Sequence, residues 1–276
     1  MKEHVKERNK NLNKLHIFLA ANYDAPFFVK KKVFQAAFSA AILYGMESWL
    51  DISLKPIEVM YMKGVRALLG VRNSTQSDLC LIEAGIPSLQ SLVHNAQAKF
   101  FRRMSARREL TDDPFGFVMN LTEQENPTMW IEIQRLLSIE DHIKKDRNDL
   151  HLSVMSRVGS KSVTYRALNP TLSTHILYTK TDYTPDSLRI TFTRLRLSSH
   201  KLRIEVGRWS KTPRHERLCV CGSLQDEKHI LTCPENERIL RKYEYSNKDI
   251  VHLFHTIDNQ RLLMLKELLV NLEGRS

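Results

Sequence analysis

The segment RLCVCGSLQDEKHILTC, residues 217–233, holds three of the chain's four cysteines together with a histidine. Its spacing is C-x-C-x7-H-x3-C, formed by Cys219, Cys221, His229 and Cys233. Thiolates and a neutral imidazole are the ligands that zinc prefers, and four of them complete a closed tetrahedral shell. The spacing therefore predicts a structural Zn²⁺ site. Three free thiols beside a surface histidine are the alternative.

The residues between these ligands fit such a site. Gly222 permits a tight turn after the first pair, and SLQD from Ser223 resembles the N-terminal capping pattern of a short helix. On that helix His229 and Cys233 lie four residues apart, so both project from one face toward the first pair. Pro234 discourages continuation of the helix. Four protein ligands leave no position for a reacting water, so a structural role is expected.

The preceding stretch, residues 187–218, carries a large excess of positive charge. We call this stretch the basic arm. Its positive residues are Arg189, Arg194, Arg196, Lys201, Arg203, Arg208, Lys211, Arg214 and Arg217. Only Glu205 and Glu216 oppose these nine, which leaves +7 of the chain's formal net charge of +11. Most of the chain's net charge is therefore in the basic arm.

We expect apolar residues such as Leu188, Phe192 and Leu195 to hold the basic arm on a core while the guanidinium groups point away from it. Arginine's planar fork donates two parallel hydrogen bonds to a phosphate. The nine basic residues are therefore predicted to contact RNA or DNA, and a solvated helix face is the alternative. Phe192 and Trp209 suit base stacking, although core packing explains them equally well.

The composition of the whole chain points to the same class of partner. In 276 residues, 42 Lys and Arg oppose 31 Asp and Glu, which favours polyanions. No apolar run approaches the roughly 20 residues needed to span a bilayer, so no membrane partner is expected. The charged N-terminus does not resemble a signal peptide, and four unevenly spaced cysteines do not suggest a disulfide framework. We expect an intracellular protein, nuclear or cytoplasmic and not secreted.

Helical periodicity dominates the rest of the chain and predicts a mainly α fold. Apolar residues at three-and-four spacing predict helices over residues 26–45, 56–69, 89–107 and 128–145. A junction is expected near Glu109, where acids, Pro114 and Gly116 interrupt the pattern. Between residues 159 and 185 the pattern fades, and VTYRAL and HILYT are expected to be short strands or extended segments. Cys80 is expected to be a buried apolar side chain.

Three phrases of the chain resemble one family. AILYGMESW from Ala41 resembles the signature that follows the polymerase palm in non-LTR (LINE-type, jockey-like) retrotransposon reverse transcriptases. VRALLGVRNSTQSDLCLIEAGIPSL from Val65 is similar to the thumb-region helices of that family. RLRLSSHKLRIEVGRW, followed by RLCVCGSLQDEKHILTCP, resembles its basic segment and CCHC zinc knuckle. The order and approximate spacing match over most of the chain.

This resemblance implies a thumb-like helical bundle over residues 1–110 and a helical or irregular connector over 111–186. It also implies a basic arm, a small zinc-knuckle α subdomain and C-terminal helices over 187–276. The polymerase's paired palm aspartates are not among these phrases, and we expect Asp112 and Asp113 to lie in a loop. The chain is therefore expected to be a truncated reverse transcriptase product without catalytic residues. The missing palm of an intact parent is a further expected partner.

Three classes of function follow from these observations. The first is zinc-stabilised binding of RNA or DNA through phosphate contacts. The alternative is a zinc-stapled helical scaffold that binds protein and has no role with nucleic acid. A zinc-dependent hydrolase or nuclease has little support, because the ligand set is closed and no histidine and carboxylate are spaced as a general base requires.

Overall fold

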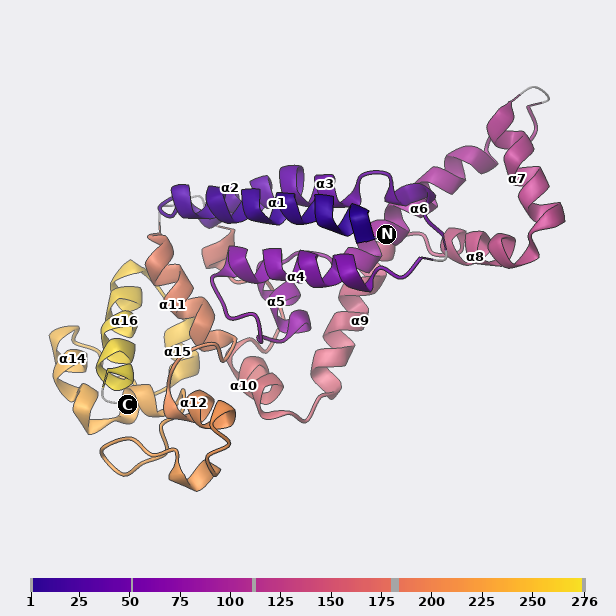
Figure 1. Ribbon diagram of the computed structural model, residues 1–276. Helices are drawn as coiled ribbons and strands as arrows, with labels where there is room; N and C mark the ends of the chain where they lie inside the picture. The colour runs from indigo at the N-terminus through magenta and orange to yellow at the C-terminus, as the bar shows by residue number, and fades with distance from the viewer. Residues whose placement is uncertain (1, 51, 111–112, 180–183, 275–276) are drawn as a thin grey trace.

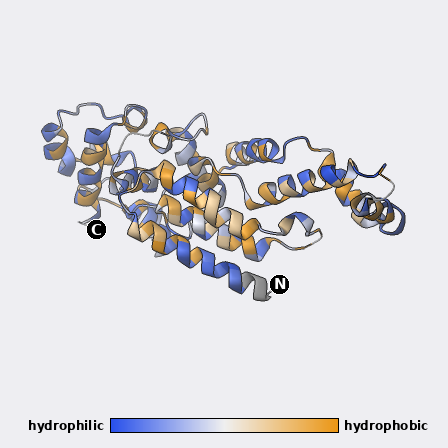
Figure 2. Cartoon of the chain, turned by 90° about the horizontal axis from the view of Figure 1, so that it is seen from above, coloured by the Kyte–Doolittle hydropathy of each residue, from blue (hydrophilic) through white to orange (hydrophobic). Residues whose placement is uncertain are grey.

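The computed structural model describes residues 2–50, 52–110, 113–179 and 184–274 (Figure 1). The chain is mainly α-helical, as predicted. Within the described ranges β-structure is limited to one antiparallel bridge between Leu218 and Leu224. Figure 2 shows hydrophobic residues in stripes along the helices, which is the pattern of amphipathic helices that bury one face.

The elements follow one another in three groups. The first comprises α1 Lys2–Ala21, α2 Phe27–Val33, the π-helical segment Phe34–Ser39, α3 Ala40–Leu43, the 3₁₀ turn Met46–Ser48, α4 Lys55–Leu69, α5 Ser77–Ala84 and α6 Leu89–Ser105. The second comprises α7 Pro114–Glu125, α8 Pro127–Leu137, α9 His142–Ser156, α10 Ser160–Leu168 and the 3₁₀ turn Ile176–Tyr178. The third comprises α11 Asp186–Arg196, α12 Arg203–Trp209, the 3₁₀ turn Arg214–Glu216, α13 His229–Thr232, the 3₁₀ turn Pro234–Asn236, α14 Glu237–Lys242, α15 Ile250–His255 and α16 Asn259–Glu273.

Helix α4 confirms the prediction for residues 56–69. Its apolar stripe is buried, and Gly70 ends it in the left-handed conformation with φ +72°. Gly64 on the same helix lets the rings of Phe34 and Phe38 lie directly on the backbone, since a Cβ at this position would clash with Phe38. Cys80 of α5 is buried in this first core, as expected, and burial raises the pKa of its thiol to about 12.

The predicted helix over residues 26–45 consists of α2, the π-helical segment and α3. Phe34, Phe38 and Ile42 are buried as expected, and Gly45 ends the run at φ +73°. Ala37 is exposed instead of buried. A π-helical turn takes in an extra residue, so the inward face no longer follows the regular α-helical spacing.

Helix α6 extends from the first core and packs with α7 and α8 into a projecting arm (Figure 1). The projecting arm has a small core of its own, which consists of Phe101, Met104, Met119, Ile133 and Leu136. Residue 112 of the expected Asp112–Asp113 loop lies outside the described residues. The Asp113 side chain caps α7 by accepting hydrogen bonds from the backbone N–H groups of residues 115 and 116.

The single helix predicted over residues 128–145 is wrong, because the chain forms α8 and then α9. The break occurs where the Asp141 side chain accepts hydrogen bonds from the backbone N–H groups of Ile143 and Lys144, at 2.9 Å each. An aspartate at this position starts a new helix. The strand interpretation of VTYRAL is also wrong, since these residues form part of α10, with Tyr165 and Leu168 buried three residues apart.

A second core lies between α11, α14, α15 and α16, and it includes Cys219 and Cys233. Helix α11 packs along α16, as Figure 1 shows. Phe192 of α11 is fully buried against the rings of His175 and Phe254. Its predicted alternative role in base stacking is therefore wrong, and its role in core packing is confirmed.

The two large cores are joined by a buried ion pair between Glu83 of α5 and Arg196 of α11. The Arg196 Nε and Nη2 atoms donate to the two carboxylate oxygens at 2.7 and 3.0 Å. The hydroxyls of Tyr165 and Tyr178 donate to the same carboxylate at 2.8 and 2.7 Å. Arg196 also donates to the Leu168 carbonyl at 3.1 Å. All four side chains of this network are buried, so the charged carboxylate is satisfied without water.

Arg189 is buried in a similar way. Its Nε atom donates to Asp186 at 2.6 Å, and its guanidinium lies 4.7 Å from the ring centroid of Phe27. The buried ammonium of Lys30 also donates to Asp186, at 2.7 Å. The prediction that the basic arm's guanidinium groups point away from the core is therefore wrong for Arg189 and Arg196. Carboxylates on neighbouring elements draw these two arginines inward.

In the part of the chain that the structure describes, no helix has both the length and the apolar character required to cross a bilayer.

Replacement of Arg196 by Met is expected to lower the free energy of unfolding by about 3 to 5 kcal/mol, because it leaves the buried Glu83 carboxylate without its counter-charge. Urea denaturation followed by circular dichroism measures this change. Arg194→Met on the same helix is the matched control, and its exposed side chain should cost less than about 1 kcal/mol. Equal destabilisation by the two variants would show that the ion pair does not join the cores.

Candidate metal centre

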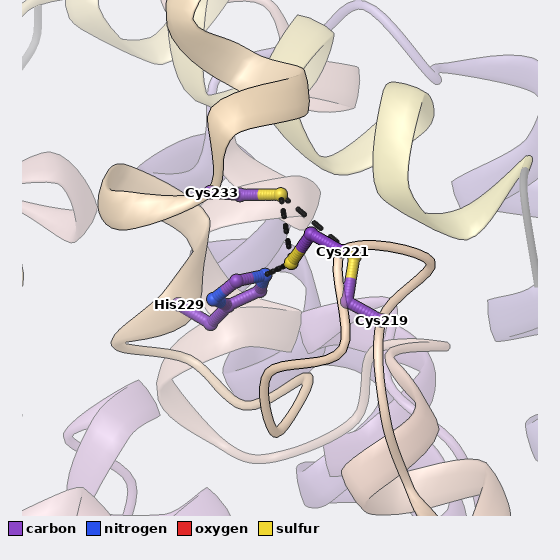
Figure 3. A group of neighbouring side chains, drawn as sticks. All are labelled: Cys219, Cys221, His229 and Cys233. Carbon is purple, nitrogen blue, oxygen red and sulfur yellow. Dashed lines mark hydrogen bonds between the residues drawn. The ribbon is translucent and has the colours of Figure 1, made fainter.

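Four side chains converge on one point between the 218–224 turn and α13 (Figure 3). The Sγ atoms of Cys219 and Cys233 are 3.7 Å apart, and those of Cys221 and Cys233 are 4.0 Å apart. The Cys221 Sγ atom lies 3.3 Å from His229 Nε2. All four donor atoms lie within 4.8 Å of one another. The sequence prediction that these four residues come together is therefore confirmed.

These distances fit a tetrahedral metal site. Ligand atoms about 2.3 Å from a central ion lie about 3.8 Å from one another along the edges of a tetrahedron. The cysteines are free, and a separation of 3.7 Å is far longer than the roughly 2.05 Å of a disulfide. The cluster is thus compatible with a metal ion held by three sulfurs and one nitrogen. Four protein ligands would fill a tetrahedral shell, so a metal ion held here would have no open coordination position.

A tight turn presents the first two cysteines. The Cys219 N–H donates to the Ser223 carbonyl at 2.7 Å, and the Gly222 N–H donates to the Cys219 carbonyl at 2.9 Å. Gly222 has φ +84°, a conformation that other residues rarely adopt, so its expected role in the turn is confirmed. The bridge between Leu218 and Leu224 closes the turn on either side.

The second pair is presented by the single turn of α13. The turn that leads into α13 is held by Asp226, whose Oδ1 atom accepts from the backbone N–H groups of Lys228 and His229 at 3.1 and 3.0 Å. The prediction that SLQD begins the helix at Ser223 is therefore wrong, since Ser223 belongs to the preceding turn. The Cys233 N–H donates to the His229 carbonyl at 2.8 Å, which keeps the two ligands one helical turn apart.

The protonation states of the cluster depend on its surroundings. Burial lowers the pKa of His229, which favours the neutral imidazole that binds metal. A hydrogen bond from the Ser223 N–H lowers the pKa of the Cys221 thiol, whereas burial raises that of Cys233 to about 12. Buried thiolates are unfavourable without a compensating positive charge, and a divalent ion supplies that charge.

The cluster is anchored in the second core. Ile230 and Leu231, which lie between the ligands, are fully buried. The Asn236 side chain donates to the Ile230 carbonyl at 2.8 Å and accepts from the Asn271 side chain of α16 at 2.9 Å. The site therefore lies against the C-terminal helix and is not an independent lobe.

The nine residues of the basic arm differ widely in exposure. Those that are exposed are Arg194, Lys201, Lys211 and Arg214; those that are half-buried are Arg203, Arg208 and Arg217; those that are buried are Arg189 and Arg196. The Arg217 guanidinium donates to the carbonyls of Thr212, at 2.9 and 2.7 Å, and of Ile204, at 3.0 Å. Arg217 therefore holds the loop before the metal cluster in shape.

Two basic residues outside the basic arm, Arg72 and Lys161, lie beside it in the fold. No sequence pattern predicted them. The Arg72 guanidinium lies 3.8 Å from the ring centroid of Trp209 and donates to the His200 carbonyl. The Lys161 ammonium lies 2.9 Å from the buried Glu205 carboxylate. Both belong to segments far from the arm in sequence, so only the tertiary fold places them beside it.

Comparison of the chain with known protein families, curated proteins and solved structures finds no match in any of the three.

Purified chain is expected to carry one transition-metal ion, and removal of this ion should expose residues 217–233 to hydrogen exchange. Metal binding supplies folding free energy to its ligand segment, whereas α1 to α5 belong to a different core. Elemental analysis and exchange mass spectrometry before and after chelation measure these two effects. Cys233→Ser should lose the stoichiometric ion, and the control Cys80→Ala should retain it. Full occupancy in Cys233→Ser would exclude the proposed ligand set.

Proposed function

We propose that this chain is a nucleic-acid-binding protein whose C-terminal region is stabilised by a structural Zn²⁺ ion. The convergence of Cys219, Cys221, His229 and Cys233 beside an exposed basic surface is the observation that carries this proposal. Three thiolates and one imidazole in a closed tetrahedral set suit zinc better than harder cations, which prefer oxygen ligands.

The partner is RNA or DNA, contacted chiefly at its phosphates. Lys201, Lys211 and Arg214 are exposed on the segment that leads into the metal cluster, and Arg194 is exposed on α11. Their charges attract any polyanionic backbone, so binding is weakly selective for sequence and strongly dependent on salt. The formal net charge of +11 adds long-range attraction.

The proposed role is binding without catalysis. It agrees with the resemblance to the C-terminal part of LINE-type reverse transcriptases, in which thumb, basic segment and zinc knuckle accompany a separate catalytic palm. Under this proposal these residues correspond to the thumb, basic segment and zinc knuckle of such a polymerase and work in the nucleus or cytoplasm, where the nucleic-acid partner is found.

A protein-interaction scaffold is the second candidate, and the projecting arm favours it. Helix α7 exposes Phe115, Phe117, Val118 and Leu121, of which Phe117 is 65% exposed. Exposed apolar side chains grouped on one short helix are typical of surfaces that bind another protein. This candidate predicts no affinity for nucleic acid at low salt, whereas the first predicts measurable affinity.

Replacement of Lys201, Lys211 and Arg214 together by Ala should weaken binding to RNA and DNA and make it less dependent on salt. Each lost phosphate contact lowers the slope of log affinity against log salt by about 1. Filter binding between low and physiological salt measures affinity and slope.

The matched control replaces Lys14, Lys55 and Lys63, which are exposed on α1 and α4, and so removes the same net charge elsewhere. This control should leave the slope nearly unchanged. Equal changes in both triple variants would assign the effect to net charge and contradict the proposed surface. An absence of binding by the unaltered chain would refute the nucleic-acid role itself.

A further inference from the structure

Trp209 is a large aromatic side chain placed at the surface and held in a fixed orientation. It ends α12 and is 49% exposed. The Arg72 guanidinium lies over its ring, 3.8 Å from the centroid. Arg72 thus covers one face of the ring, and about half of the side chain remains open to solvent.

Arg72 is itself fixed from several directions. Its Nε and Nη2 atoms donate to the carbonyls of Ser199 and His200, at 3.1 and 2.5 Å. Its backbone N–H donates to the Ser199 hydroxyl at 3.0 Å. His200 is in turn buried against Glu227, at 3.0 Å. These contacts brace the covered face of Trp209, so a ligand on the open face meets a ring that is already ordered.

Other basic side chains lie near Arg72, the residue that covers this ring. Arg208 precedes it in sequence, and Lys161 reaches the same carboxylate as Arg208, that of Glu205. Burial, together with the positive charges of Arg208 and Arg72, lowers the pKa of Lys161 to about 8. Arg194 is close enough to Arg72 to lower its pKa as well, after the larger effect of burial.

Three carboxylates lie among these basic side chains and offset part of their charge, but two of the three are buried. Glu205 is fully buried beneath Lys161 and Arg208, and Glu227 is buried against His200 and Ser198. Glu273 lies close enough to raise the pKa of Arg72, and its Oε1 atom accepts from the Lys201 N–H at 2.6 Å. The basic side chains therefore lie nearer to solvent than the buried carboxylates do.

We propose that Trp209 is a stacking platform for an unpaired nucleobase and that the nearby basic side chains hold the phosphates on either side of that base. Proteins bind single strands with aromatic rings that lie near basic side chains, since every base has a flat face and paired bases are not free to stack on protein. This inference rests on the proposed function and adds to it a preference for single-stranded segments. RNA and DNA both carry the required base.

The test uses tryptophan fluorescence of the full chain. Trp49→Phe and Trp130→Phe together leave Trp209 as the sole tryptophan of the chain's three. Titration at low salt with oligouridylate, oligothymidylate and a blunt duplex of equal length reports stacking directly. Saturable quenching by either single strand, with none by the duplex, is the expected result. Binding of single strands without quenching would overturn the stacking inference and leave the proposed function standing.

Affinity measurements on Trp209→Ala provide an independent readout. Loss of one base–aromatic stack should weaken binding of single strands about 10-fold or more and leave duplex binding within about twofold. Trp209→Phe keeps an aromatic face and should restore most of the lost affinity. Equal weakening of single strands and duplex, or no rescue by Phe, would show a structural role and overturn the inference. If neither nucleic acid binds the unaltered chain, the proposed function fails first.

Discussion

The buried ion pair between Glu83 and Arg196 is the constraint on which the arrangement of the rest depends. Two helices that lie more than a hundred residues apart in sequence meet through this pair, one from each large core. A carboxylate removed from water must find donors in the protein, and here an arginine fork and two tyrosine hydroxyls supply them. Because the required geometry is narrow, the pair fixes where α11 lies against α5. The position of α11 in turn places α12 and the cysteine cluster.

The arginines of the basic arm therefore have different structural roles. Arg189 and Arg196 are buried in ion pairs, and Arg217 holds the backbone of the loop before the cluster. Arg194 and Arg214 remain exposed on the same stretch and carry charge to the surface. The guanidinium suits all three uses, since it is always charged and presents five donors in a rigid fork. Net charge counted along a sequence consequently overstates the charge available to a polyanion.

Local features were predictable from the sequence where short-range physics decides them. The α4 stripe, the turn at Gly222 and the gathering of four soft ligands all follow from local sequence. The burial of Arg196 was not predictable, because its partner lies 113 residues away and no local pattern marks Glu83. The bracing of Trp209 by Arg72 likewise depends on a long-range contact. The cap at Asp141 was not predicted because the expected helix ran across this position. The role of Asp226 in the turn before α13 was not predicted because the expected helix began too early, at Ser223.

The packing of α16 has a consequence for the order in which this protein acquires its structure during translation. Residues 259–273 cover the second core and contact the segment around Asn236 through Asn271. Ribosomes deliver the chain from the N-terminus, so α16 is the last of the described helices to become available for packing. The buried residues of the first core end at Leu197, so this core can pack before α16 has been made. Packing of the second core is therefore complete only when α16, the last of the described helices, is present.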